Sequence, residues 1–462
     1  MVFSSVQFLL YFLPIFFILY GLTPDKFKNV MLTAASLVFY AMGEPRYLGL
    51  LLLSVFVNYF VGLHLGVDWK KGSHNRQKQT KLKFENDKKR KILLIASVIG
   101  NIGVLILFKT GVGEKGLPLG ISFYTFQILS YLIEVYQGKI QRERSFLKFA
   151  TYITMFPKLI SGPIVSYDEV EKDLSYRKFS LEKLQDGLQL FVVGLAAKVL
   201  LADRVGILWH EVQVTGFESI STPLAWLAAL AYAMQIYFDF YGYSLMAVGL
   251  GRMLGFELPI NFKTPYMARS VRDFYRRWHI TLGRWFCRYV YIPLGGNRKG
   301  EFRTICNLLI VWVLTATWHG STVNFLIWGL LLVTCIIIER QLEKTGIIKR
   351  LKVLPHVYLW FVILISWMCF AITDLGQLQV YLGRMFHVVE GISVRSGDWL
   401  AALENYGGLF LVAILGCTPL MEKLYRKCKD HLVGKLMLAA LFWICVRRLM
   451  IEGDNPFMYF QF

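Results

Sequence analysis

The chain has 462 residues, of which 55% are hydrophobic and only 18% are charged. Its mean hydropathy of +0.47 exceeds what a water-soluble domain of this length needs, so part of the apolar surface must face something other than water. This composition excludes a disordered, fibrous or ordinary cytosolic protein.

Charge and cysteine content narrow the class of protein further. The formal net charge is +20, from 51 Lys and Arg against 31 Asp and Glu. On a soluble protein this charge would suggest nucleic-acid binding. On a hydrophobic chain, the first explanation to test is the excess of Lys and Arg that cytoplasmic loops of membrane proteins carry. The seven cysteines are odd in number and show no CxxC or Cys/His ligand spacing. We therefore expect no disulfide framework and no metal site.

Long apolar runs follow one another from the first residues onward. Residues 2–21 carry no charge and lack the basic start and small-residue cleavage site of a signal peptide, so they are predicted to form the first membrane helix. Further apolar runs lie at residues 30–42, 47–67, 92–108, 117–133, 184–202, 222–251, 305–317, 322–338, 353–372, 406–420 and 436–446. The shorter runs must tilt or re-enter, because about 20 residues are needed to cross the hydrocarbon. We predict an all-α integral membrane protein with about 11–12 transmembrane helices in one polytopic domain, residues 1–462.

The most basic loop, residues 68–91, fixes the expected orientation. It holds ten Lys and Arg against three Asp and Glu, which predicts a cytoplasmic loop. Counting spans outward then places the basic clusters at 139–144, 263–303, 349–352 and 423–429 on the same face, with both termini outside. The localisation predicted is a plasma membrane, and membrane lipid is the expected partner of the positive charge. No nucleic-acid partner is expected.

Two segments do not have the pattern of simple spans. Residues 149–165 carry Lys158 between Pro157 and Gly162, and such residues break a helix unless neighbouring groups satisfy the freed backbone. We predict a re-entrant or buried segment there. Residues 262–303 mix Arg with aromatic side chains, which indicates amphipathic or re-entrant helices at the cytoplasmic side.

Two histidines are the main candidates for chemistry. His319, in Trp318-His319-Gly320, stands between two apolar runs, and an ionisable residue within the membrane is a functional candidate by default. The alternative is a histidine bonded to a backbone carbonyl at a helix end. His279 is the second candidate, and its alternative is a surface histidine on an interfacial helix.

Two other features of the apolar runs need partners or close packing. Asp239 is the most deeply placed carboxylate, and we expect an Arg or His of residues 263–303 to pair with it. The glycine-rich run 249–255 lacks the spacing of a dinucleotide fingerprint and follows a membrane helix. It is predicted to allow close helix packing.

These residue types suit acyl transfer. A neutral imidazole can take a proton from an alcohol while a second group orients the reactants, without a covalent serine. Arg and Lys at the cytoplasmic side suit the phosphates of coenzyme A or of a carrier-bound donor. The donor-binding candidates are Arg276, Arg277, Trp278 and Lys158. The alternative is a transporter or flippase without bond chemistry, although the paired, interrupted spans typical of such proteins are not found here.

Several motifs in a fixed order resemble those of the membrane-bound O-acyltransferase family. They are MFPKLISGPIV (155–165), IYFDFYGYS (236–244), GLGRMLGF (249–256), NFKTPY (261–266), DFYRRWHITLGRW (273–285), YIPLGGNRKG (291–300), WHG (318–320) and NPFMYF (455–460). The resemblance runs from about residue 117 to the C-terminus and more loosely to the N-terminus. Within the family, the chain is similar to bacterial members that O-acetylate alginate and other exported polysaccharides.

The resemblance implies a ring of tilted spans around a central funnel, with His319 as the catalytic histidine and His279 as the second family histidine. It also implies that an acyl group, most often acetyl, is taken from a cytoplasmic thioester such as acetyl-coenzyme A. The group is then delivered across the bacterial plasma membrane, usually to a separate extracytoplasmic acyltransferase that modifies the polysaccharide acceptor.

Two positions depart from the family pattern. Cys287 and Arg288 stand where an Arg-Asp pair is common, and Leu245 stands where an Asp often follows GYS. These departures leave the donor and acceptor more open than the reaction class. Relatives that transfer D-alanine to teichoic acid lack the YIPLGGNR stretch in this form, so D-alanyl transfer is the alternative acyl chemistry.

Overall fold

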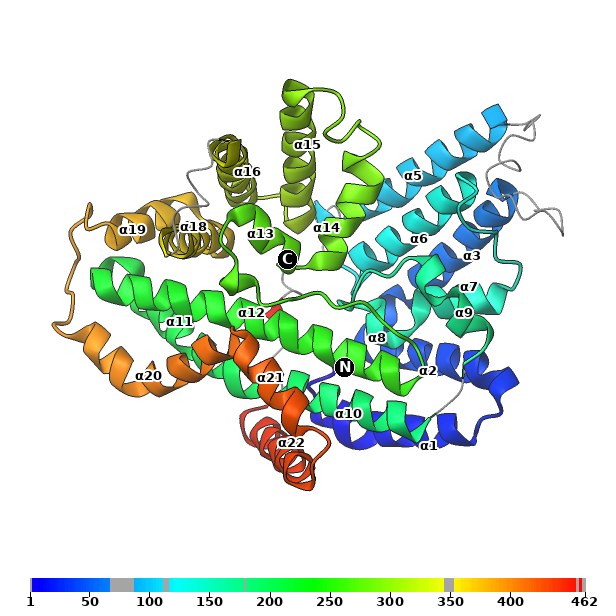
Figure 1. Ribbon diagram of the computed structural model, residues 1–462, viewed down its shortest axis with the longest axis horizontal. Coiled ribbons are helices and arrows are strands. Elements are labelled where there is room, and N and C mark those ends of the chain that lie inside the picture. The colour runs from blue at the N-terminus through cyan, green and yellow to red at the C-terminus, as the bar shows by residue number, and fades with distance from the viewer. Residues whose placement is uncertain are drawn as a thin grey trace. The chain divides into compact units, whose positions relative to one another are not determined.

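The computed structural model describes residues 2–66, 87–110, 116–177, 180–344, 353–453 and 457–458. Within these ranges the chain forms helices and no strands, which confirms the predicted all-α class (Figure 1). Most of the predicted loop 68–91, the basic cluster 349–352 and four residues of the last motif, 455, 456, 459 and 460, lie outside the described residues.

The residues group into two compact units. Unit 1 comprises Met1–Phe191 and Met246–Pro259, and unit 2 comprises Val192–Leu245 and Ile260–Phe462. Two helices, α10 (Leu181–Ala196) and α12 (Thr222–Met253), contribute residues to both units. The expectation of a single membrane domain stays a prediction.

Unit 1 is a bundle of helices with short connecting turns. Its elements are η1 (Phe8–Phe12), α1 (Leu13–Leu22), η2 (Asp25–Phe27), α2 (Lys28–Gly43), η3 (Pro45–Tyr47), α3 (Leu48–Leu65), α5 (Asp87–Lys109), α6 (Ile121–Tyr136), α7 (Phe146–Thr154), α8 (Phe156–Leu159) and α9 (Tyr167–Ser175). The apolar helices α3 and α5 are joined by Asn58 and Asn101, whose side-chain amides exchange two hydrogen bonds of 3.1 and 2.9 Å. Between apolar helices, such amide pairs fix which faces meet.

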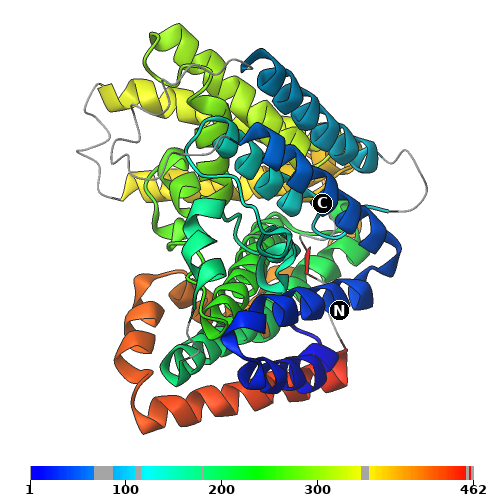
Figure 2. The same cartoon turned by 90° about the vertical axis from the view of Figure 1, so that its right-hand side faces the viewer.

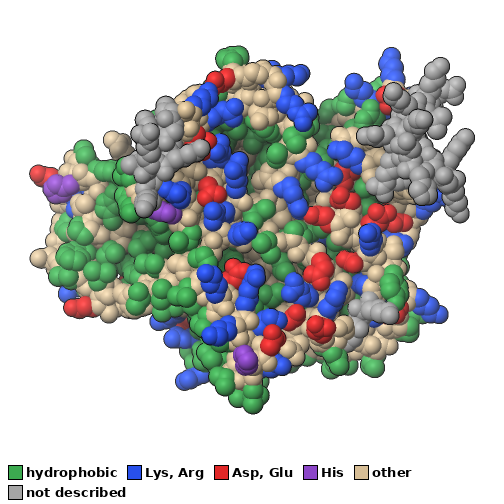
Figure 3. Space-filling view, viewed as in Figure 1, with side chains coloured by type: hydrophobic (Ala, Val, Ile, Leu, Met, Phe, Trp, Pro, Cys, Tyr) green, Lys and Arg blue, Asp and Glu red, His purple; other side chains and the backbone are tan. Residues whose placement is uncertain are grey.

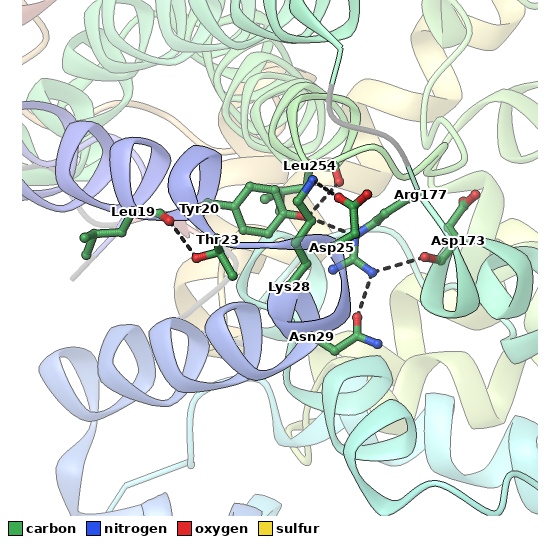
Figure 4. A network of polar contacts seen from close by, with 9 residues as sticks. All are labelled: Leu19, Tyr20, Thr23, Asp25, Lys28, Asn29, Asp173, Arg177 and Leu254. Atoms are coloured by element: carbon green, nitrogen blue, oxygen red, sulfur yellow. Dashed lines mark hydrogen bonds and ion pairs between the residues drawn. The ribbon is translucent and has the colours of Figure 1, made fainter.

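A buried arginine holds the ends of several helices of unit 1 together (Figure 4). Arg177 donates to the Tyr20 hydroxyl at 2.9 Å, to the Asn29 side chain at 2.7 Å and to the carbonyl of Asp173 at 3.1 Å. The Tyr20 hydroxyl in turn donates to the carbonyl of Leu254 at 3.1 Å. Because the planar guanidinium has five donors in a fixed geometry, one side chain can link α1, α2, α9 and the end of α12.

The segment 149–165 is a broken, buried stretch, as predicted. The chain leaves helix geometry at Met155 between α7 and α8, and Lys158 on α8 has no exposed surface. The freed backbone finds partners within the protein, because the N–H of Phe156 donates to the hydroxyl of Ser36 at 3.0 Å. A chain break surrounded by apolar helices is tolerated only when its polar groups are satisfied in this way.

Unit 2 contains longer helices and a run of short ones. Its elements are η4 (Ala197–Ala202), α11 (Asp203–Thr215), η5 (Phe217–Ser219), η6 (Pro265–Met267), α13 (Val271–Arg277), α14 (Ile280–Phe286), η7 (Cys287–Tyr291), α15 (Glu301–His319), α16 (Val323–Lys344), α18 (Leu354–Ala371), α19 (Leu375–Met385), α20 (Asp398–Gly416), α21 (Pro419–Cys428) and α22 (Leu432–Glu452). Helices α15 and α16 lie side by side, and α16 packs on α18 (Figure 1). Helices α20, α21 and α22 each pack on the next (Figure 2).

Five helices of the described residues are long and apolar enough to cross a membrane. They are Pro45–Leu65, Asp87–Lys109, Val323–Lys344, Leu354–Ala371 and Asp398–Gly416, and Phe8–Leu22 is a shorter apolar helix. Their sides expose many large apolar side chains, as expected where a protein surface contacts lipid. The predicted 262–303 segment is divided into the short helices η6, α13, α14 and η7 before α15 begins at Glu301. Blue Lys and Arg side chains are spread over the face of the molecule that Figure 3 shows.

The partner of Asp239 differs from the one expected. Its carboxylate pairs with Lys198, at 2.9 Å between Nζ and Oδ1, and not with an Arg or His of residues 263–303. Lys198 also pairs with Asp203, and the second oxygen of Asp239 accepts the backbone N–H of Met458 at 2.9 Å. The buried Lys198 and Asp239 therefore have each other as partners, which is the condition for keeping such groups in an apolar interior.

Close helix contacts at glycine explain this pairing. A Cβ at Gly242 would lie 2.5 Å from the carbonyl oxygen of Gly194 and 3.0 Å from the backbone nitrogen of Lys198, so only glycine lets the chain carrying Lys198 approach α12. In unit 1, a Cβ at Gly249 would lie 2.5 Å from the carbonyl oxygen of Gly187. This confirms the prediction that the glycine-rich run serves close helix packing.

Substitution of Gly242 by alanine is expected to destabilise the protein by about 1–3 kcal/mol, because the new methyl group overlaps the Gly194 carbonyl. The matched control is Gly407→Ala on α20, where a Cβ would meet nothing within 4 Å and alanine favours the helix. The measurement is the Tm of each detergent-purified chain. Equal Tm values for the two variants would contradict the prediction.

Candidate active site

Unit 2 contains an open cavity of about 600 Å³ that both candidate histidines line. His319 reaches it from the end of α15, and His279 reaches it from the junction of α13 and α14. Most of its remaining wall is aromatic or aliphatic, and the polar lining residues are Arg272, Arg276, Arg284, Arg340, Asn297 and Thr315. An apolar cavity with a few convergent polar groups is the usual form of a small-molecule site.

His319 is the last residue of α15 and is almost enclosed by aromatic rings. The centroid of its imidazole lies 4.7 Å from Trp318, 5.1 Å from Trp328 and 5.0 Å from Phe370, each in an edge-to-face arrangement. Only 6% of the residue is exposed. The rings fix the orientation of the imidazole and keep water from most of its surface.

Gly320 is required for this packing. A Cβ at this position would lie 2.2 Å from a ring carbon of Phe325, whose ring is 6.3 Å from the imidazole of His319. The glycine of the WHG motif thus lets the aromatic wall approach the end of α15.

His279 has an unusual backbone conformation. Its φ of 44° and ψ of 53° lie in the left-handed region, which non-glycine residues rarely adopt, and the residue forms the junction between the two seven-residue helices α13 and α14. The side chain is 3% exposed, with its ring 4.7 Å from Phe240 and perpendicular to it. Burial lowers the pKa of His279 from 6.5 to about 3, so the imidazole is neutral at physiological pH.

One tryptophan contacts both histidines. The ring of Trp318 lies 6.1 Å from that of His279 and 4.7 Å from that of His319, between centroids. Trp278, a predicted donor-binding residue, also lines the cavity and packs 5.0 Å from Trp367. The structure therefore brings the two histidines and Trp278 to one site, although they are up to 41 residues apart in the sequence.

Arginines give the cavity a positive wall. Arg276 and Arg284 are exposed, and Arg340 is partly buried at the cavity wall from α16. No Asp or Glu occurs among the described residues that line this space. Guanidinium groups beside an apolar chamber suit a ligand with an anionic end and an uncharged reacting end.

Helix α13 is fixed to α16 by two carboxylates. Buried Glu339 accepts the backbone N–H groups of Val271 at 2.6 Å and Arg272 at 3.1 Å, which are the first donors of α13. Exposed Glu343 accepts two hydrogen bonds from the side chain of Arg272. The anion at the helix N-terminus satisfies groups that have no partner within the helix.

Two predicted donor-binding residues lie elsewhere. Arg277 is not among the cavity-lining residues, and its guanidinium pairs with Asp273 one turn earlier, at 3.0 Å. Lys158 belongs to unit 1, where its ammonium group contacts the side chain of Gln127 and lies 4.3 Å from the centre of the Tyr152 ring. Their part in donor binding, predicted from the sequence, gains no support from the lining of this cavity.

Sequence reasoning missed other residues of the cavity. Arg284 belongs to the quoted motif DFYRRWHITLGRW, so it could have been chosen together with Arg276 from that motif. Arg340, Trp328 and Trp367 come from apolar helices that carry no local motif. Only the packing of α15, α16 and α18 brings them to the site.

Comparisons with known proteins agree with this architecture. The model of the MBOAT, membrane-bound O-acyltransferase family matches residues 37–373. The chain is 32% identical to the "Probable alginate O-acetylase AlgI" of Azotobacter vinelandii over all of both chains. It is 34% identical to the "Peptidoglycan O-acetyltransferase" of Helicobacter pylori, over 83% of this chain and 80% of that one. The "Teichoic acid D-alanyltransferase" of Bacillus subtilis is 27% identical over 58% of this chain and 69% of its own length.

The buried, neutral state of His279 predicts sensitivity to acid. Because its pKa is lower in the folded protein than in the unfolded chain, the unfolded chain binds the proton more readily. The contribution of neutral His279 to the free energy of unfolding is therefore fully present above about pH 6.5. It decreases as the pH falls from 6.5 toward 3. From pH 7 to pH 5 we expect a loss of about 2 kcal/mol from this residue.

The measurement compares the Tm of the wild-type chain and of His279→Gln at pH 7 and pH 5. The other histidines titrate equally in both chains, so the difference between the two slopes reports His279. A wild-type chain that loses no more Tm than His279→Gln on acidification would contradict the prediction.

Proposed function

The chain belongs to the membrane-bound O-acyltransferase family, and from this premise we propose that it transfers an acetyl group from a thioester donor for the O-acetylation of an exported bacterial cell-envelope polysaccharide. It is an O-acyltransferase and a multi-pass membrane protein. The observation that carries the proposal is the largely aromatic cavity that both histidines and four arginines line. The names of the relatives, which refer to alginate and peptidoglycan O-acetylation, support acetyl as the group transferred.

The bond chemistry follows from His319. Its imidazole accepts the proton of an acceptor hydroxyl as the hydroxyl oxygen attacks the thioester carbonyl carbon. The C–S bond then breaks, the sulfur leaves as a thiolate and takes the proton from the imidazolium of His319, so that an ester, a free thiol and the neutral imidazole result. The neutral imidazole of His279, held on the same cavity, orients the reacting groups. The surrounding rings exclude water, which would otherwise hydrolyse the thioester.

The arginine wall is the proposed donor subsite. Arg276, Arg284 and Arg340 would bind the phosphates of acetyl-coenzyme A, and Trp278 would pack beside the acyl-bearing arm. Charge-assisted hydrogen bonds to phosphate are stronger than neutral ones, and Arg binds phosphate in a planar, two-pronged manner. No metal takes part in this proposal.

The topology of the reaction rests on the charge pattern of the loops. If the basic loops face the cytoplasm, the donor enters from that side, and the acetyl group leaves on the opposite side of the membrane. A separate extracytoplasmic acyltransferase would then complete transfer to the polysaccharide. D-alanyl transfer remains the alternative acyl chemistry, and it would appear as D-alanine esters on the acceptor.

Replacement of His319 by alanine is expected to lower acetylation at least about a hundredfold, because a positioned acid–base group contributes about 10²- to 10⁴-fold to such reactions. The measurement is the base-labile acetate on cell-envelope and secreted polysaccharide, from cells that carry the wild-type chain, the variant or neither, at equal membrane levels of protein. The matched control is His210→Ala, which alters an exposed histidine of α11 outside the cavity.

Each outcome of this experiment has a clear meaning. Acetate that appears with the wild type and His210→Ala, and is absent with His319→Ala, supports the proposal. Equal acetate in all cells would contradict it and favour a transport function without bond chemistry.

Adjacent arginines allow a sharper test of the donor subsite. Arg276→Gln should raise the KM for acetyl-coenzyme A by about tenfold or more, since a hydrogen bond to a charged group contributes about 1.5–3 kcal/mol. Arg277→Gln should change this KM less than threefold, because Arg277 faces Asp273 and not the cavity. The measurement is thiol release by membrane vesicles containing each chain. The reverse order of the two effects would contradict the assigned subsite.

A further inference from the structure

The left-handed backbone of His279 must be held by its surroundings. A bulky non-glycine residue at φ 44° occupies a sparsely populated conformation, and such residues persist where neighbouring groups determine the geometry. The residue lies between two helices that are too short to fix it by their own backbone bonds. The groups that contact the start of α14 therefore decide where the imidazole points.

Asn261 supplies three acceptor contacts to the first turn of α14. Its main-chain oxygen accepts the N–H of Ile280 at 2.9 Å. Its side-chain Oδ1 accepts the N–H of Thr281 at 3.3 Å and the hydroxyl of Thr281 at 2.7 Å. All three donors belong to the two residues that directly follow His279, so Asn261 acts in place of the missing preceding turn of a helix.

The location of Asn261 limits what it can do. The residue is 1% exposed and is not among the residues that line the cavity, so it does not touch a ligand there. Its Oδ1 is engaged as described, whereas its Nδ2 has no hydrogen-bond partner among the described residues. The acceptor oxygen is thus the functional half of this side chain.

A second contact reinforces the same junction from the other side. The N–H of Lys263, two residues after Asn261, donates to the carbonyl of Arg277 at 3.0 Å. The segment 261–263 therefore bonds both to the end of α13 and to the start of α14. His279 lies between these two bonded positions, so the segment 261–263 holds the chain on both sides of it.

We propose that Asn261 is a positioning residue that holds His279 in its left-handed conformation and so aims the imidazole into the cavity. The inference rests on the proposed function for its kinetic consequence. Asn261 contributes to turnover through His279 and makes no contribution to donor binding. A loss of the Oδ1 acceptor therefore lowers kcat and leaves the KM of the donor unchanged.

The test uses the full-length chain in membrane vesicles with acetyl-coenzyme A as the donor. Asn261→Leu removes the acceptor at similar volume, Asn261→Asp retains an acceptor oxygen, and Thr281→Val removes only the hydroxyl donor. The matched control is Thr215→Val on α11, whose hydroxyl bonds within its own helix to Glu211. For each chain, kcat, donor KM and Tm are measured.

We expect Asn261→Leu to lower kcat at least tenfold with a donor KM within threefold of wild type. Asn261→Asp should keep kcat within fivefold of wild type, and Thr215→Val should equal wild type. If Asn261→Leu does not fold, Thr281→Val carries the test, with an expected loss of kcat above threefold at an unchanged Tm and KM.

Two results would overturn the proposal. One is a kcat for Asn261→Leu, or for Thr281→Val where the former does not fold, within threefold of wild type. The other is an equal loss for Asn261→Asp and Asn261→Leu, because the acceptor oxygen would then be irrelevant.

A failure of the proposed function gives a different pattern. In that case the wild-type and His319→Ala chains release thiol equally, and kinetics no longer report on His279. Experimental structures of the wild-type and Asn261→Leu chains then decide the inference. A positive φ at residue 279 that is lost in the variant supports it, and the same φ in both chains overturns it.

Discussion

The site depends on satisfying backbone groups at helix ends that lie inside the protein. Helices α13 and α14 are two turns long and begin where little water can reach, so their first N–H groups need acceptors from elsewhere in the chain. Glu339 provides them for α13, and Asn261 provides them for α14. These acceptors satisfy N–H groups that a short helix leaves without a partner inside the protein, and so they stabilise the break between α13 and α14 at which His279 lies.

Apolar and charged surfaces are separated within the one cavity. Tryptophan and phenylalanine rings surround His319, while the guanidinium groups of Arg276 and Arg284 remain exposed. A guanidinium group keeps its charge in either environment, whereas an imidazole becomes neutral on burial. The cavity therefore combines the permanent positive charge of exposed guanidinium groups with the neutral imidazole of His279.

The class of fold was predictable from the sequence, because it depends on local signals. The catalytic roles of the two histidines stay predictions, although both residues line one cavity. Apolar runs identify helices, and the contexts of His279 and His319 are contiguous motifs. The broken segment around Lys158 was also predictable, since Pro and Gly interrupt a helix by known sterics. The predicted partner of Asp239 was wrong, because Lys198 reaches the carboxylate through a close contact at Gly242. Close contacts between distant segments leave no local signal in the sequence. Arg340 and the anchoring role of Asn261 were missed for the same reason.

The position of His319 depends on the number of residues in the helix that precedes it. His319 ends a continuous helix that begins at Glu301, and one residue inserted within α15 would turn it by about 100° about the axis and shift it by about 1.5 Å. The imidazole would then leave its aromatic enclosure. The loop before Glu301 can change length without this effect. Natural variation in the spacing between the two histidines should thus be confined to the connection ahead of α15, so the length of that helix is as diagnostic of a working site as the histidine itself.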